Sequence, residues 1–478
     1  MVSTKKYSFP FYLTAICFLF LLFAASVTAE ARQVPESRTQ INLSYAPVVK
    51  KTAPAVVNIY AERVVQQRGG FGFSPFFNDP LFQQFFGQDL FAPPMRRRLE
   101  RSLGSGVIVS EDGLMISNAH VIKGAQEITA VMADGQEYQA EIVLLDERTD
   151  LAVLQIDSGG RELPYIELAD SDEAEVGDLV LAIGNPFGVG QTVTSGIISA
   201  AARTAVGITD YSFFLQTDAA INPGNSGGAL VGMHGRLLGI NTAIFSRSGG
   251  SLGIGFAVPS NMVRAVIDAA RGDGTIRRSW FGVSAQRLTG DIAQSLGLES
   301  VRGALITEVH PASPAGKAGL KTGDVVTHIN GRPVEDPDAL RFRTALVRIG
   351  DEILLNVVRR GRALQIRFTA VAPPENPPRE TTELSGRHPL AGVVVANLSP
   401  AVAEEMGAAR PRVESGVVVK NVAARSRIGL RVGDVIREIN GNEIKSVRDA
   451  VSALGQPAPV WDMVILRGNQ NIRMRVSG

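Results

Sequence analysis

The feature that most constrains the fold is an internal repeat in the C-terminal half of the chain. Residues 319–326, GLKTGDVV, recur as residues 429–436, GLRVGDVI. Residues 329–331, Ile-Asn-Gly, recur as residues 439–441, so the offset is 110 residues in both cases. Units of roughly 90–100 residues are too long for the repeats of a solenoid, so the pattern predicts two copies of one domain.

The segment between the two copies is rich in proline and polar residues. Residues 372–385 read APPENPPRETTELS, a composition typical of a semi-rigid, extended linker. This places the first copy at 279–371 and the second at 386–478. A chain of 478 residues is too long for one hydrophobic core, and residues 41–272 are expected to form a separate domain.

Short strand signals separated by turns fill residues 102–270, which favours a mostly β structure, a sandwich or a barrel. Residues 48–65 predict a short helix and then a strand. Residues 260–271 predict a helix that closes the domain, with Ser260 or Asn261 as its N-cap. Residues 66–101 contain eight phenylalanines among Gly, Pro, Gln and Asp, and they predict a long loop.

The N-terminus has the pattern of an export signal. Lys5 and Lys6 precede the apolar run 9–25, and small residues allow cleavage after Ala29. An uncleaved membrane anchor is the alternative, but the proline inside the run and the adjacent cleavage site favour a signal peptide over residues 1–29. The mature protein is then exported to the periplasm and soluble, able to associate with a membrane without being integral to it.

The single cysteine, Cys17, lies inside this segment, so the mature chain has no disulfide. The net charge of +1 gives no bias toward nucleic acid. Residues 41–270 carry 15 basic and 24 acidic side chains, whereas residues 386–478 carry 13 and 8. Ordinary surface variation accounts for this difference, and electrostatic docking between domains is the alternative.

Three segments have residues suited to nucleophilic catalysis. His120 lies in SNAHVI, Asp150 in RTDLAV, and Ser226 in NPGNSGGAL. A serine hydroxyl needs a base within hydrogen-bond reach and a third group that fixes the tautomer of the base. The order His, Asp, Ser is that of chymotrypsin-like double barrels. The glycines beside Ser226 allow a sharp turn, which would form an oxyanion hole from Gly224, Asn225 and Ser226.

Each of these residues alone is more often structural. The other histidines, His234, His310, His328 and His388, lie in turns or in the repeated units and are interpreted as structural or surface residues. Three suitable residues in the right order within one β-rich domain favour a catalytic triad of His120, Asp150 and Ser226.

These segments closely resemble those of the HtrA/Do (Deg) serine proteases, as do GNPFG at 184–188, TVTSGIIS and GIGFAVPSNM. The resemblance covers nearly all of the mature chain. It implies a chymotrypsin-like double β-barrel followed by two PDZ-like α+β domains. It also implies ATP-independent endoproteolysis of unfolded or damaged exported proteins, chaperone-like holding, and homotrimers that build larger cages.

The resemblance also assigns residues around the triad. Ile221, Ile244 and Ile254 match the primary specificity pocket, which would accept small or β-branched apolar side chains; packing of the barrel core is the alternative. The substrate backbone would pair by β-addition with the strand formed by Thr242, Ala243, Ile244, Phe245 and Ser246. Arg203 matches a regulatory sensor loop, and an ordinary exposed arginine is the alternative.

The Phe-rich segment 66–101 resembles the long first loop of the family, without the cysteine pair that some members carry there. An exposed aromatic cluster is costly in water. We therefore expect this loop to pack on a partner subunit or to gate the site.

Each repeated unit contains a match to the loop with which PDZ domains hold a chain-terminal carboxylate. These loops consist of Trp280, Phe281, Gly282 and Val283 in the first unit and Leu390, Ala391, Gly392 and Val393 in the second. The first is expected to bind hydrophobic C-terminal peptides. The second match is weaker because of Ala391, which favours a role in assembly; a purely structural module is the alternative.

The sequence contains no metal-binding cluster and no phosphate-binding loop, so no cofactor is expected. Two other functions stay open. One is a PDZ-based holdase or scaffold with a silent protease domain, which the intact triad disfavours. The other is a hydrolase of small esters, which the absence of a G-x-S-x-G elbow around Ser226 disfavours.

Overall fold

The computed structural model describes residues 44–65, 98–184, 190–203, 213–222, 224–244, 253–272, 274–298, 301–407, 411, 413, 415–422 and 429–477. The predicted signal peptide and residues 66–97 of the predicted long loop lie outside these ranges. Within these ranges, no helix has the length and apolar character needed to cross a membrane.

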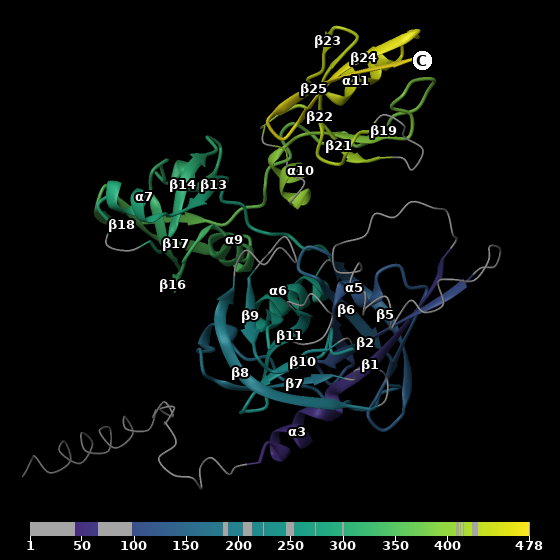
Figure 1. Cartoon of the computed structure of the whole chain (residues 1–478), viewed down its shortest axis with the longest axis vertical. Helices are drawn as coiled ribbons and strands as arrows, with labels where there is room; N and C mark the ends of the chain where they lie inside the picture. Colours follow the sequence, from purple (N-terminus) through teal and green to yellow (C-terminus); the bar gives the residue numbers. More distant parts are fainter. Residues whose placement is uncertain are drawn as a thin grey trace, which may run out of the picture. The chain divides into compact units, whose positions relative to one another are not determined.

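Six strands of the N-terminal domain close into a first barrel. Its elements are α3 (Ala46–Thr52), η1 (Ala53–Ala55), β1 (Val56–Val65), β2 (Arg98–Ile108), β3 (Leu114–Ser117), α5 (Ala119–Ile122), β4 (Glu127–Val131), β5 (Glu137–Asp146) and β6 (Leu151–Ile156). The strand order around the barrel is β1-β2-β3-β6-β5-β4. Figure 1 labels β1, β2, β5 and β6 of this barrel. Every residue of β3 is buried.

Six further strands close into a second barrel. Its elements are η3 (Ser171–Glu173), β7 (Leu179–Gly184), β8 (Thr192–Arg203), β9 (Phe214–Thr217), β10 (Ala229–Gly232), β11 (Leu237–Ile244) and β12 (Gly255–Pro259). The ring β7-β8-β9-β12-β11-β10 repeats the order of the first barrel. The predicted double barrel is therefore confirmed.

Two expectations about the ends of elements were wrong. The helix α6 (Ser260–Arg271) begins at the predicted residue, but its N-cap is Pro259. The Ser260 hydroxyl instead donates to the Ala169 carbonyl, so it ties the helix to an earlier segment. Residues 98–101, assigned to the long loop, belong to β2 and pair with β1, because the β1–β2 ladder extends ten residues from Val56.

The first repeated unit is a six-stranded sheet with helices. Its elements are β13 (Val283–Arg287), α7 (Gly290–Ser295), β14 (Ala304–Val309), α8 (Pro314–Lys317), β15 (Val325–Ile329), β16 (Arg332–Pro333), α9 (Pro337–Leu346), β17 (Glu352–Arg359) and β18 (Arg362–Thr369). The strand order is β13-β14-β15-β17-β18, and β16 pairs with β15.

The second repeated unit has the same core order with one more strand. Its elements are β19 (Thr382–Glu383), β20 (Val394–Asn397), α10 (Pro400–Glu405), β21 (Val417–Asn421), β22 (Val435–Ile439), β23 (Asn442–Glu443), α11 (Val447–Leu454), β24 (Val460–Arg467) and β25 (Gln470–Ser477). The order is β19-β20-β21-β22-β24-β25. The sheet therefore includes residues 382–383, which the sequence assigned to the linker.

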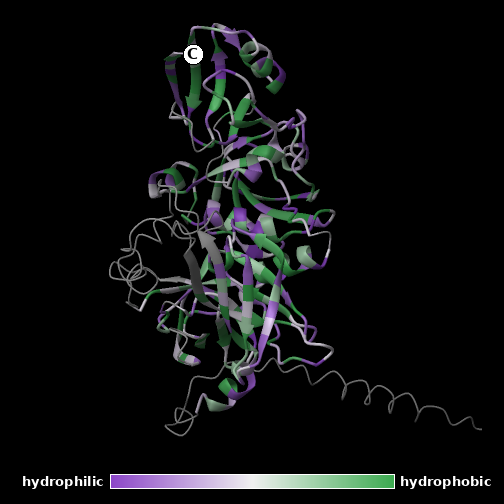
Figure 2. Cartoon of the chain, turned by 90° about the vertical axis from the view of Figure 1, so that its right-hand side faces the viewer, coloured by the Kyte–Doolittle hydropathy of each residue, from purple (hydrophilic) through white to green (hydrophobic). Residues whose placement is uncertain are grey.

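Buried and half-buried residues alternate along β17 and β24, the corresponding hairpin strands of the two units. Hydrophobic and hydrophilic stretches accordingly succeed one another along many strands in Figure 2. This period of two is typical of strands with one face against a core.

The aspartate of the repeated Gly-Asp motif has the same role in both units. Asp324 is 1% exposed, accepts from the Lys321 N–H, and is paired with Arg359 at 2.6 Å. Asp434 is equally buried and is paired with Arg467 at 2.7 Å. The motif recurs because each copy closes its turn with a buried carboxylate that an arginine neutralises.

Candidate active site

His120 lies in the one-turn helix α5, directly after β3. The segment before it is fixed by the backbone of Asp150, whose carbonyl accepts from the Ala119 N–H at 3.1 Å and from the Asn118 side-chain amide at 2.9 Å. These bonds hold the loop after β3 against the loop before β6. The side chains of His120 and Asp150 therefore meet although 30 residues separate them.

The Asp150 carboxylate has four hydrogen-bond contacts. Its two oxygens lie 2.7 and 2.9 Å from Nδ1 of His120, and one of them accepts from the His120 backbone N–H at 3.0 Å. The Thr242 hydroxyl donates to it at 2.6 Å from β11 of the second barrel. Asp150 has a φ of +58°, a strained conformation for a residue with a side chain, which these contacts hold in place.

The same contacts shift the pKa values of the pair. Burial lowers the pKa of His120, but the charge of Asp150 and its hydrogen bond together outweigh burial, so the pKa is raised above its ordinary value of 6.5. Burial raises the pKa of Asp150, but the charge of His120 and the hydrogen bonds from His120 and Thr242 outweigh it, so the pKa of the carboxyl is lowered. The carboxylate is thus charged at neutral pH and orients the imidazole.

Ser226 lies in a tight turn before β10. Gly224 and Gly227 have φ of +101° and +84°, which favour glycine. A Cβ at Gly227 would lie 2.0 Å from the Ser105 carbonyl oxygen and 2.5 Å from Oγ of Ser117. Close backbone approach therefore requires glycine after the serine.

Ser105 holds this turn from the first barrel. Its hydroxyl donates to the Gly224 carbonyl at 2.7 Å, and its N–H donates to the Ser226 carbonyl at 2.8 Å. Its own carbonyl accepts from the Ser117 hydroxyl at 2.7 Å. One residue of β2 thus positions the turn that carries Ser226.

The Ser226 hydroxyl donates to the Thr242 carbonyl over 3.4 Å, a weak hydrogen bond. No hydrogen bond joins it to His120 among the described contacts. Thr242 therefore contacts both halves of the site, through its side chain to Asp150 and through its backbone to Ser226. Catalytic hydrogen bonds are often long before substrate binds.

The predicted oxyanion residues have a distinct pattern of backbone contacts. The Asn225 N–H donates to the Asn222 carbonyl at 3.0 Å. Within the described ranges, no acceptor contacts the N–H groups of Gly224 and Ser226. The Asn225 side chain is fully buried, and neither of its polar atoms has a described partner.

The residues predicted to bind substrate or to regulate the site differ in burial, and some of them lie outside the described residues. Ile221 is 2% exposed, and a Cβ at Gly255 would lie 2.7 Å from its Cδ1, so the two residues pack together. Ile254 is half-buried. Ala243 and Ile244 lie at the end of β11, and Arg203 ends β8. Two residues of the predicted substrate-pairing strand, Phe245 and Ser246, lie outside the described residues. Residues 204–212, the rest of the predicted sensor loop, also lie outside them.

The two predicted carboxylate loops share a backbone feature. Gly282 and Gly392 have φ of +64° and +81°. Trp280, Phe281 and Leu390 are buried. The ring of His310 lies edge-on to that of Trp280, with 5.3 Å between the ring centroids. His388 and Trp461 have a similar arrangement, with 6.1 Å between the ring centroids, so both histidines pack within the repeated units.

The sequence did not indicate three of the supporting contacts. Ser105 and Asn118 were not singled out, and Thr242 was assigned only to substrate binding. Thr242 lies 92 residues from Asp150, and no spacing rule signals their hydrogen bond. Among the described residues, no group of three or more His, Cys, Asp or Glu side chains could hold a metal ion.

Comparison with protein families identifies two modules. Residues 104–240 match the trypsin-like peptidase domain, and residues 250–369 match the PDZ domain.

Full-length relatives agree with both assignments. A probable periplasmic serine endoprotease, DegP-like, of Marinomonas sp. is 38% identical over 89% of each chain. The periplasmic pH-dependent serine endoprotease DegQ of Escherichia coli is 37% identical over 90% of each chain. Among solved structures, the HtrA-type protease AlgW with decapeptide is 44% identical, with a TM-score of 0.51 over 70% of this chain and 99% of that chain.

Proposed function

Because this chain belongs to the HtrA family of periplasmic serine endoproteases, we propose that Ser226, His120 and Asp150 are its catalytic triad. Ser226 is the nucleophile, His120 the general base and Asp150 the group that orients the base. The observation that carries the proposal is the contact of the Asp150 carboxylate with Nδ1 of His120, at 2.7 and 2.9 Å. This contact leaves Nε2 as the nitrogen that faces the substrate chemistry.

In the first half-reaction the Ser226 hydroxyl turns from the Thr242 carbonyl to Nε2 of His120. Its oxygen attacks the scissile carbonyl carbon while the proton passes to the imidazole. The C–N bond then breaks, and the same proton goes to the departing amine. Asp150 stabilises the imidazolium, which its effect in raising the pKa of His120 supports.

Water completes the cycle by hydrolysing the acyl-enzyme, again with His120 as base. The oxyanion of each tetrahedral intermediate is held by the N–H groups of Gly224 and Ser226, with Asn225 between them in the turn. Losing one such donor typically costs about 10²–10³ in rate. The left-handed φ of Gly224 and the lack of a described acceptor for either N–H support this assignment.

The substrates we propose are unfolded or damaged exported polypeptides, cleaved after small or β-branched apolar residues. Ile221, Ile244 and Ile254 line the pocket, and residues 242–246 pair with the substrate backbone by β-addition. The buried packing of Ile221 on Gly255 supports a shallow, dry pocket. No nucleotide drives unfolding, so cleavage is independent of ATP, and the same surfaces hold unfolded chains as a chaperone does.

Assembly and regulation extend the proposal. Homotrimers, and cages built from them, bring the Phe-rich segment 66–101 and Arg203 to the sites that they regulate. The first PDZ unit binds hydrophobic C-terminal peptides in the loop Trp280–Val283. The buried aromatic residues of this loop and the left-handed φ of Gly282 support a fixed carboxylate site.

Degradation of casein separates this proposal from its rival, a holdase with a silent protease domain. The wild-type protein should degrade casein without added nucleotide, and Ser226→Ala should not, while both bind it. Equal loss of casein with the two proteins would contradict the role of Ser226. Binding without degradation by the wild type would favour the holdase.

A further inference from the structure

The peptide-binding edge of the second PDZ unit is already paired. The strand after its carboxylate loop, β20, pairs on one side with β21 and on the other with β19. The β19–β20 pairing is antiparallel, with Thr382 opposite Val395 and Glu383 opposite Val394. In the first unit the equivalent strand, β13, pairs with β14, and no other described strand lies on its outer edge.

The residue after β19 bonds directly to the carboxylate loop. The Leu384 N–H donates to the Val393 carbonyl at 2.9 Å, and the Gly392 N–H donates to the Leu384 carbonyl at 2.7 Å. A PDZ ligand adds as an extra strand and places its terminal carboxylate on the loop N–H groups. The Leu384 carbonyl oxygen thus takes the position of one carboxylate oxygen of such a ligand.

The side chain of Leu384 completes the match. It is 2% exposed and belongs to the core cluster that contains Leu390, Val447 and Ala450, from the loop and from α11. A buried leucine between the carboxylate loop and the helix occupies the place where an apolar terminal side chain of a ligand would lie. The preceding residue, Glu383 of β19, is exposed, as expected for a ligand strand with alternating faces.

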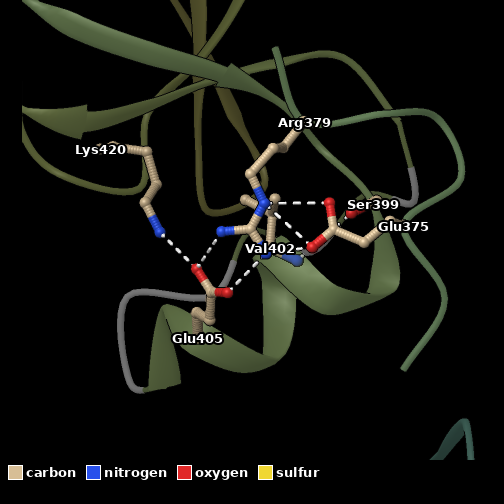
Figure 3. A network of polar contacts seen from close by, with 6 residues as sticks. All are labelled: Glu375, Arg379, Ser399, Val402, Glu405 and Lys420. Atoms are coloured by element: carbon tan, nitrogen blue, oxygen red, sulfur yellow. Dashed lines mark hydrogen bonds and ion pairs between the residues drawn. The ribbon is translucent and has the colours of Figure 1, made fainter. Parts of the chain in front are cut away.

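Charged contacts hold the upstream end of this segment (Figure 3). The Arg379 guanidinium bonds to Glu375 and, at 2.7 Å, to Glu405 at the end of α10. Glu405 also accepts from Lys420 at 3.1 Å. The backbone of Arg379 contributes as well, since its carbonyl accepts from the Asn397 N–H at 2.7 Å.

We propose that residues 379–384 are an internal ligand of the second PDZ unit. The groove is a binding site for an extended chain end with a terminal leucine, and it accepts an external one only when this segment leaves. The first unit has no such occupant among the described residues, so the two units differ in access. The inference concerns peptide binding alone and holds whether or not the protease mechanism proposed above is right.

Hydrogen exchange of the wild-type protein tests whether the segment behaves as a ligand. An internal ligand opens locally, so the Leu384 amide should exchange at least tenfold more slowly than an unstructured amide but at least tenfold faster than that of Val419, a core amide bonded to Asp434. Less than tenfold protection would overturn the proposal. Exchange within tenfold of the Val419 rate would overturn it too, since the segment would then be a fixed strand.

Peptide binding tests the site itself. The probe is the hexapeptide RETTEL, the sequence of residues 379–384 with a free carboxylate and a fluorescein at its N-terminus. All proteins carry Ser226→Ala so that the probe is not cleaved. Titrations followed by anisotropy should show one more probe site per chain in Leu384→Ser than in the control Glu383→Gln, which alters an exposed side chain of the same segment.

Two further variants keep the result decisive. Adding Gly392→Val to Leu384→Ser should remove the gained site, because a β-branched residue disfavours the φ of +81° that orients the N–H of this loop. If Leu384→Ser loses the near-ultraviolet signal of Trp461, a buried tryptophan of this unit, Arg379→Gln replaces it and weakens only the upstream contacts. A folded variant without a gained site, or a gain that survives Gly392→Val, would overturn the proposal.

Discussion

The first barrel, β1–β6, and the second, β7–β12, have the same strand order. They differ in how firmly hydrogen bonds orient the side chains that each contributes to the site. The loop after β3 and the loop before β6 supply an imidazole and a carboxylate that are already bonded. The turn before β10 supplies a hydroxyl that bonds weakly to a backbone carbonyl. The proposed base is therefore already oriented in the resting protein, and the proposed nucleophile has still to turn toward it.

The two barrels provide similar scaffolds, and the loops between their strands carry the residues that differ. In each barrel the loop after the third strand carries a proposed catalytic residue, His120 after β3 and Ser226 after β9. The barrels hold these loops rigidly, and loop sequence decides what each one offers. Thr242 of β11 joins the two halves through its contacts with both Asp150 and Ser226.

The largest effect is expected from removing either reacting group. Ser226→Ala and His120→Ala should each lower kcat/KM for a peptide substrate by about 10⁴–10⁶, because hydroxyl and imidazole act as one unit. The double variant should lose little more than either single one. Steady-state kinetics with active-site titration would check this, and a His120→Ala enzyme with more than a tenth of wild-type activity would refute the shared role.

Asp150→Asn should lower kcat by about 10⁴ while leaving the fold intact, because the imidazole then adopts the wrong tautomer. The pH profile should change as well. His120 acts as a base only when neutral, so its raised pKa places the acid limb of the wild-type profile above pH 6.5. Without the Asp150 charge that pKa falls, and the limb should move to lower pH; an unmoved limb would show that another group controls it.

Thr242→Val tests the residue that joins the halves. It removes the 2.6 Å hydrogen bond to the buried carboxylate, and such bonds to charged groups contribute about 1.5–3 kcal/mol. We expect kcat to fall about 10- to 150-fold, with most of the activity recovered in Thr242→Ser, which keeps the hydroxyl. Equal losses in the two variants would contradict the role assigned to the hydroxyl, since Thr242→Ser keeps it.

Ser105→Ala should have the smallest effect. It removes one neutral hydrogen bond to the Gly224 carbonyl, worth about 0.5–1.5 kcal/mol. The expected loss is about 2- to 10-fold in kcat with little change in KM, because the turn loosens without losing a reacting group. A larger loss in kcat for Ser105→Ala than for Thr242→Val would contradict the expected order of the two effects.

The sequence was sufficient for the parts of the molecule that local pattern determines. Short alternating runs predicted the barrel strands, and the repeated Gly-Asp motif predicted two related units, whose buried Asp324 and Asp434 explain the repeat. The segments around His120, Asp150 and Ser226 were recognisable because each combines a reactive residue with a turn. Proximity of the three could be inferred only through their order and family resemblance.

What the sequence did not reveal depends on long-range pairing. The bond from Thr242 to Asp150 and the support of the nucleophile turn by Ser105 link different barrels, and no periodicity reports such contacts. The segment around Thr382 and Leu384 has the composition of a linker, yet its backbone pairs with β20 and Leu384 belongs to the hydrophobic core of the second unit. The prediction that Ser260 caps α6 was wrong for a similar reason, since its hydroxyl donates to the Ala169 carbonyl in a distant segment.

The central claim is that His120 activates Ser226 across the two barrels, and covalent labelling tests it most directly. A fluorophosphonate that reacts only with activated serines should add once per chain in an intact-mass spectrum, on the peptide that contains Ser226. Labelling should slow by at least about a thousandfold in His120→Ala. Modification of a different serine, or an unchanged rate without the imidazole, would contradict the account.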